Sequence, residues 1–186
     1  MLFRSVSQSR YRYQGVFWVD DFAQVREQER YTRFLEFFFQ ACGDQPLSVN
    51  MAALMRKETT YFTSKFMLMT SNGPNADLNN VILDKTAFQR RFNFTIEMFL
   101  KPAFEHPNGG IDAEKAAGVE LDDVYEFSIK TFNIKKRRNC PMTYDGQDRV
   151  NFTTLAKIIA GWHLHTRARH TAAGIVTGKQ IGRAHV

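Results

Sequence analysis

Short apolar runs separated by longer amphipathic stretches organise the first part of the chain. Residues 16–19 join β-branched and aromatic side chains without interruption, which is typical of a strand buried on both faces in a parallel sheet. Residues 66–70 form a second run of this kind. Between the two, residues 24–41 repeat apolar side chains at helical spacing, and Gly43 follows as a helix stop. This pattern predicts a strand, a helix and a second strand.

The rest of the chain predicts shorter elements and one long helix. Strands that alternate with helices favour an α/β fold with a mostly parallel sheet and flanking helices. We expect, in chain order, a short helix at 50–57 capped by Asn50, one or two helical turns at 85–91, a strand at 92–96, a loop at 106–120, a strand at 124–132 and a helix at 152–167.

Composition narrows the class of protein. The chain has 186 residues, a net charge of +6, 44% hydrophobic and 24% charged residues, which is the composition of a globular domain and not of a disordered one. Its 17 Phe predict a large aromatic core. No apolar run approaches the roughly 18 residues that cross a bilayer, and no secretory leader is expected. The two cysteines lack zinc spacing and favour a reducing compartment.

Polar side chains follow both apolar strands. Asp20 and Asp21 come directly after Val19, and Thr70, Ser71 and Asn72 come after Met69. Ligands of parallel sheets bind beyond the carboxyl ends of the strands. A strand that ends in two acids is the Walker B pattern, in which one carboxylate holds Mg²⁺ and the other acts on the attacking water. Taken alone, such a pair is more often a solvated strand end or a helix cap.

The order of the neighbouring segments adds a family resemblance. Four blocks follow one another: Tyr-Gln-Gly-Val-Phe-Trp-Val-Asp-Asp-Phe-Ala-Gln at 13–24, Met-Ala-Ala-Leu-Met-Arg-Lys at 51–57, Phe-Thr-Ser-Lys-Phe-Met-Leu-Met-Thr-Ser-Asn at 62–72 and Ala-Phe-Gln-Arg-Arg-Phe-Asn-Phe at 87–94. This succession resembles the superfamily 3 RNA helicase of picorna-like positive-strand RNA viruses, an AAA+ P-loop NTPase within the replication polyprotein. The resemblance covers residues 11–105.

The resemblance implies a nucleotide site. ATP or another NTP and Mg²⁺ would be the cofactors. Asp20 and Asp21 would be the Walker B pair, with Asp20 holding Mg²⁺ through water. Asn72 would be the polar sensor that orients the attacking water, and Thr70 would contact the nucleotide beside it. Arg90 and Arg91 would be arginine fingers that reach the γ-phosphate of an adjacent subunit, where a planar, permanently charged guanidinium suits phosphate oxygens.

The resemblance also implies partners. Lys57 and Lys65 match the region that faces the central pore of the ring, where they would bind single-stranded RNA. The expected assembly is a homo-hexamer that works with viral replication proteins in the host cytoplasm, with any membrane attachment outside this chain.

Departures from the family pattern limit the resemblance. The phosphate-cradling Gly-x-x-x-x-Gly-Lys-Ser/Thr loop has no match, because residues 174–180 read Gly-Ile-Val-Thr-Gly-Lys-Gln. We therefore expect an N-terminally truncated ATPase core at 1–134, inactive by itself, and a C-terminal helical extension at 135–170. Residues 171–186 are expected to be a non-native or disordered tail, since Ile-Gly-Arg-Ala-His-Val matches a translated sequencing adapter.

Two other functions stay open. The chain could be part of a cellular AAA+ ATPase, or a non-catalytic RNA-binding or assembly module that kept the sheet and lost the chemistry. The run Lys135-Lys136-Arg137-Arg138 could touch RNA, although a solvated loop between two elements is the favoured interpretation.

Overall fold

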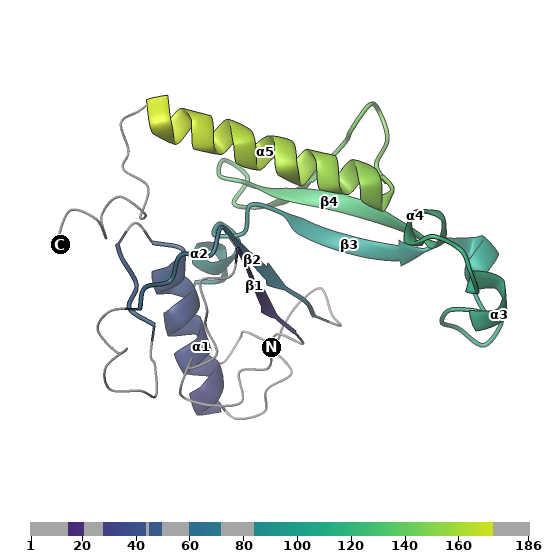
Figure 1. Cartoon of the computed structure of the whole chain (residues 1–186), viewed down its shortest axis with the longest axis horizontal. Helices are drawn as coiled ribbons and strands as arrows, with labels where there is room; N and C mark the ends of the chain where they lie inside the picture. The colour runs from purple at the N-terminus through teal and green to yellow at the C-terminus, as the bar shows by residue number, and fades with distance from the viewer. Residues whose placement is uncertain (1–14, 21–27, 44, 50–59, 72–83, 173–186) are drawn as a thin grey trace. The chain divides into compact units, whose positions relative to one another are not determined.

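The computed structural model describes residues 15–20, 28–43, 45–49, 60–71 and 84–172. Its described residues divide into two compact units, one that ends at Lys85 and one that begins at Thr86. Figure 1 draws the elements of both. The expected division between an ATPase core at 1–134 and a C-terminal extension at 135–170 stays a prediction.

Two parallel strands form the sheet of the first unit. β1 (Val16–Val19) pairs with β2 (Phe66–Met69), with Val16 opposite Phe66 and Val19 opposite Met69. The pairing continues past both ends. The Gly15 carbonyl accepts the N–H groups of Lys65 and Phe66, at 2.9 and 3.1 Å, and the N–H of Thr70 donates to the Val19 carbonyl at 3.0 Å. Both predicted strands are confirmed.

The burial of β1 differs from the prediction. Phe17 and Val19 are each 6% exposed, whereas Val16 and Trp18 are 51% and 50% exposed. The ring of Phe17 packs on Phe37 with 5.6 Å between centroids, so one face of the strand lies against a helix. The expected burial on both faces is wrong, because Val16 and Trp18 alternate to the other face of the strand.

The covering helix is α1 (Gln28–Ala41). Its buried face consists of Phe34, Leu35, Phe37 and Phe38. Phe37 also meets Phe62 edge-on at 5.4 Å, and Phe62 meets Phe17 at 5.4 Å, so three aromatic rings join helix and sheet. The predicted helix and aromatic core are confirmed, and Gly43 follows the helix end as expected.

An antiparallel bridge closes the segment between α1 and β2. Ser48 pairs with Tyr61. The N–H of Val49 donates to the Thr60 carbonyl and the N–H of Phe62 donates to the Leu47 carbonyl, each at 2.8 Å. Val49 is 1% exposed and Thr60 4% exposed. The two ends of the intervening segment are therefore held side by side. The helix predicted at 50–57 lies outside the described residues.

The sheet of the second unit is antiparallel. Its order is β3 (Thr95–Leu100), β4 (Tyr125–Asn133) and β5 (Arg138–Met142). The prediction of a mostly parallel sheet is wrong for these described strands. Residues 134–137 alone join β4 to β5, and a parallel pair needs a crossover of about a dozen residues or more. The strands predicted at 92–96 and 124–132 exist with shifted ends, and β5 was not predicted.

One long helix covers a face of this sheet. α5 (Phe152–Ala172) lies along β4 in Figure 1. Leu155 is buried with Ile129 of β4 and with Val150. Farther along the helix, Trp162 packs edge-on against Phe94 with 5.5 Å between ring centroids. The predicted helix at 152–167 is confirmed and continues to Ala172. No helix among the described residues has the length and apolarity to cross a membrane.

The start of α5 is fixed by two side chains. The Asn151 side-chain oxygen accepts the N–H of Thr154 at 2.9 Å. Asp122, in α4 (Leu121–Val124), accepts the N–H of Thr153 at 3.0 Å through Oδ1 and the Thr153 hydroxyl through Oδ2. The first N–H groups of a helix have no partner inside it. Asp122 satisfies one of them and places a negative charge at the positive end of the helix dipole.

We predict that Asp122→Ala lowers the free energy of unfolding by about 1 kcal/mol, the usual cost of losing a helix cap. Asp123→Ala is the matched control, because Asp123 is the exposed next residue of the same short helix. Urea unfolding followed by circular dichroism measures both. Equal losses in the two variants would contradict a capping role for Asp122.

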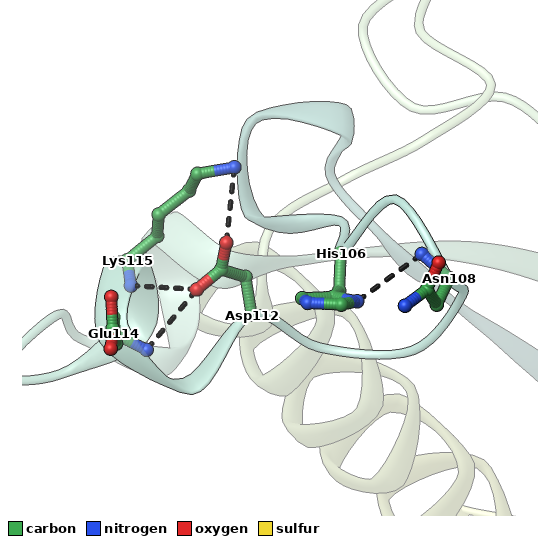
Figure 2. A network of polar contacts seen from close by, with 5 residues as sticks. All are labelled: His106, Asn108, Asp112, Glu114 and Lys115. Carbon is green, nitrogen blue, oxygen red and sulfur yellow. Dashed lines mark hydrogen bonds and ion pairs between the residues drawn. The ribbon is translucent and has the colours of Figure 1, made fainter.

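Two short helical elements lie between β3 and α4, and the second of them falls in the stretch 106–120 expected to be a loop. The elements are η2 (Pro102–Phe104) and α3 (Ala113–Ala116). Asp112 Oδ1 accepts the N–H groups of Glu114 and Lys115, each at 3.2 Å, and Asp112 Oδ2 lies 3.1 Å from the Lys115 ammonium. Figure 2 shows this network beside the His106 ring, whose Nδ1 accepts the Asn108 N–H at 3.2 Å.

The hydrogen bonds from the Lys115 N–H and the Lys115 side chain hold the pKa of Asp112 below its ordinary value. The folded pKa is lowered, so this contribution to stability is present above the unfolded pKa and is lost as pH falls through the folded one. We predict that Lys115→Gln raises the Asp112 pKa toward its ordinary value. Carboxyl NMR titration measures it, with Glu105→Gln as a control that leaves the cap intact. An unchanged pKa in Lys115→Gln would contradict the assignment.

Candidate functional site

The carboxyl ends of β1 and β2 bring two of the predicted site residues together. Asp20 follows β1 and Thr70 follows β2. The Thr70 hydroxyl donates to Asp20 Oδ1 at 2.6 Å, and the Thr70 N–H donates to the carbonyl of the residue before Asp20. The backbone bond thus fixes the spacing, and the side-chain bond orients the carboxylate. Asp21 and Asn72 lie outside the described residues.

The chemistry of this edge suits a hard cation. Asp20 is exposed and Thr70 is half-buried, so the carboxylate faces water. Mg²⁺ binds through one or two carboxylates, keeps several waters and accepts hydroxyl oxygens. A carboxylate and a hydroxyl on adjacent parallel strands fit such a cation. Sequence reasoning placed Thr70 near the nucleotide but missed its bond to Asp20. The signal was available, because polar residues that directly follow two adjacent parallel strands meet at one sheet edge.

Lys65 lies at the opposite end of β2. It immediately precedes the strand, its N–H donates to the Gly15 carbonyl at 2.9 Å, and its side chain is exposed. At about 3.3 Å per residue, the five steps from Lys65 to Thr70 span roughly 16 Å. The proposed RNA contact and the Asp20 edge therefore lie at different ends of the same sheet. Lys57 lies outside the described residues.

The two predicted arginine fingers follow α2 (Lys85–Gln89) in the second unit. The N–H of Arg90 donates to the Thr86 carbonyl at 3.0 Å, and its side chain is exposed. Arg91 is half-buried, and its guanidinium Nη1 donates to the Ala87 carbonyl. Its charge therefore lies at the carboxyl end of the helix, where carbonyl groups lack helical partners and cations are favoured. Arg90 and Arg91 therefore differ in the structure: Arg90 is exposed, whereas Arg91 is bound to the backbone of α2.

We predict that Arg91→Ala lowers the free energy of unfolding by about 1 kcal/mol, because the Ala87 carbonyl loses a charged donor. Arg90→Ala should change it by less than about 0.5 kcal/mol, as an exposed substitution does. Guanidinium unfolding of both variants tests the difference, and a larger loss in Arg90→Ala would contradict it.

Comparison with known protein families supports part of this assignment. Residues 5–73 match the family described as RNA helicase. The match contains β1, α1 and β2 and ends just beyond Asn72, so both strands of the candidate site lie inside it, whereas Arg90 and Arg91 do not. It confirms the resemblance to a partial superfamily 3 RNA helicase domain and supports a helicase-like, NTP-dependent function at the level of the family. No curated protein matches the chain.

Proposed function

We propose that this chain is part of a viral RNA helicase or remodelling ATPase that couples NTP hydrolysis to RNA rearrangement during genome replication. The observation that carries the proposal is the Asp20–Thr70 contact at the carboxyl edge of a parallel strand pair, within the segment that matches the RNA helicase family. This edge is where nucleotide sites occur in parallel sheets.

In this proposal Asp20 would hold Mg²⁺ through water, and the Thr70 hydroxyl, which donates to Asp20 Oδ1, would orient the carboxylate. Asp21 would accept a proton from the attacking water, and Asn72 would orient that water. Bound Mg²⁺ would neutralise charge that develops on the phosphates.

Arg90 is the better candidate for a residue that acts across a ring interface. Its exposed side chain suits contact with the γ-phosphate of an adjacent subunit in a hexamer, where a finger contributes about 10³-fold or more to the rate. Arg91 would support it by holding the end of α2 through the Ala87 carbonyl. In the same proposal the chain works with viral replication proteins in the host cytoplasm.

The RNA contacts proposed for this unit are Lys57 and Lys65. Lys65 is exposed at the end of β2 remote from Asp20, so RNA and nucleotide would occupy separate ends of the sheet.

Two other functions remain candidates. A cellular AAA+ ATPase would use the same edge but would have less reason to show the Asp-Asp-Phe-x-Gln and Met-Ala-x-Leu segments. A non-catalytic RNA-binding module would bind RNA without any response to nucleotide.

The test is ATP hydrolysis in a longer protein that includes a phosphate-binding loop. We predict that Asp21→Asn lowers the rate by about 10²-fold or more, the usual contribution of a general base. Thr70→Val should lower it by about 10- to 100-fold, because a hydrogen bond to a charged group is worth about 1.5–3 kcal/mol.

Thr70→Ser is the matched control, since it keeps the hydroxyl and should retain most of the activity. The 186-residue chain should show only background hydrolysis, because its sequence has no Gly-x-x-x-x-Gly-Lys-Ser/Thr loop. Mg²⁺-dependent hydrolysis by this chain that Asp21→Asn abolishes would refute the need for that loop. Full activity of Asp21→Asn in the longer protein would refute the proposed mechanism.

A further inference from the structure

Charge is divided unevenly along the second unit. Residues 86–126 carry eight Asp or Glu and four Lys or Arg, whereas residues 127–172 carry two Asp or Glu and nine Lys or Arg. The sequence contains no acidic residue between Glu126 and Asp145, and none after Asp148. A single-sign cluster of this size has an electrostatic field that attracts a partner of opposite charge.

The fold places part of these basic residues toward one end of the sheet. Thr95, the first residue of β3, pairs with Lys130, so β4 runs on past this level to Asn133 and the turn at 134–137. α5 reaches the same level where Trp162 packs on Phe94, and it too continues, carrying Arg167 and Arg169. The opposite end holds α4, whose Asp122 binds the start of α5 (Figure 1).

The turn presents four cations to solvent. The side chains of Lys135, Lys136, Arg137 and Arg138 are all exposed. The Asn133 side-chain oxygen accepts the Lys136 N–H at 2.9 Å, and Arg137 has a φ of 50°, so the backbone of the turn has a defined conformation. In the described part of the chain no carboxylate lies within ion-pair distance of the four. By contrast, Lys130 pairs with Glu97, and Arg149 pairs with Glu126 at 3.6 Å.

We propose that this basic end, formed by residues 134–138 with Arg169, binds the phosphodiester backbone of single-stranded nucleic acid. When exposed cations bind phosphates, they displace counterions that are condensed on the nucleic acid, and this release drives backbone binding. Ile134, 82% exposed at the tip, adds an apolar surface that a base can cover. That the nucleic acid is RNA rests on the proposed function, whereas the phosphate contact itself does not require hydrolysis.

The acidic end of a second copy of the chain is a less suitable ligand for the basic end than nucleic acid is. Asp112 already binds Lys115, Asp122 binds the start of α5, and Glu126 binds Arg149. These three acidic groups are therefore engaged within the chain, whereas a single strand of nucleic acid presents a continuous row of phosphates.

The test measures binding of the 186-residue chain to fluorescent oligouridine and oligothymidine by anisotropy, without nucleotide, over a range of salt concentrations. The variant combines Lys135→Gln, Lys136→Gln, Arg137→Asn and Arg138→Gln, in which Asn suits the positive φ at residue 137. The control exchanges Lys and Arg at the same four positions and so conserves charge. Circular dichroism and thermal unfolding confirm that both variants fold.

We predict that the neutral variant binds at least about tenfold more weakly at low salt. The slope of log affinity against log salt concentration should be smaller in magnitude by about 3, as expected for four lost contacts with a single strand. The charge-conserving variant should bind like the parent. Asp20→Asn should also bind like the parent, so failure of the hydrolytic mechanism would leave this inference standing.

Three results would overturn the inference. One is an affinity and salt slope unchanged in the neutral variant. Another is equal weakening in the charge-conserving variant, which would indicate a structural defect. The last is loss of self-association in the neutral variant with unchanged nucleic-acid binding, which would assign the basic end to a second copy of the chain. Tighter binding to oligouridine than to oligothymidine would support RNA as the ligand, and the reverse preference would overturn that part.

Discussion

The arrangement of the candidate site depends on the parallel hydrogen bonding between β1 and β2. The last of these bonds, from the Thr70 N–H to the Val19 carbonyl, places the threonine hydroxyl beside the carboxylate of the next residue, Asp20. A slip of one residue would turn the side chains of β2 to the opposite faces and separate the two groups. The register resists such a slip because Phe17, Phe37 and Phe62 pack together on one face of the sheet.

Much of the first unit could be predicted from the sequence because its elements are locally determined. The runs at 66–70 and 16–19 have the side chains that strands favour, and the helix ends just before Gly43, which contributes no side chain at the exposed end. The burial of β1 could not be predicted. A run of four apolar residues fits a strand covered on one face as well as one covered on both, and the tertiary contacts decide between them.

Several features of the second unit could not be predicted from local sequence patterns. β5 contains Asn139 and Pro141, which are disfavoured in strands, and it exists because its backbone pairs with β4 across a tight turn. The cap that Asp122 gives to Thr153 joins residues far apart in the sequence, so no spacing rule predicts it. Arg90 and Arg91 are equivalent in sequence, and only the position of the Ala87 carbonyl distinguishes them.

The antiparallel bridge between Ser48 and Tyr61 has a consequence for how the sequence can vary. Because the bridge returns the chain to its starting point, the span between its ends can change in length or composition without disturbing the strands on either side. Each doubling of such a span costs only about 0.6 kcal/mol in closure entropy. Lys57, the proposed RNA contact, lies within this span. Insertion or exchange of residues within this span would therefore leave the edge that holds Asp20 and Thr70 unchanged.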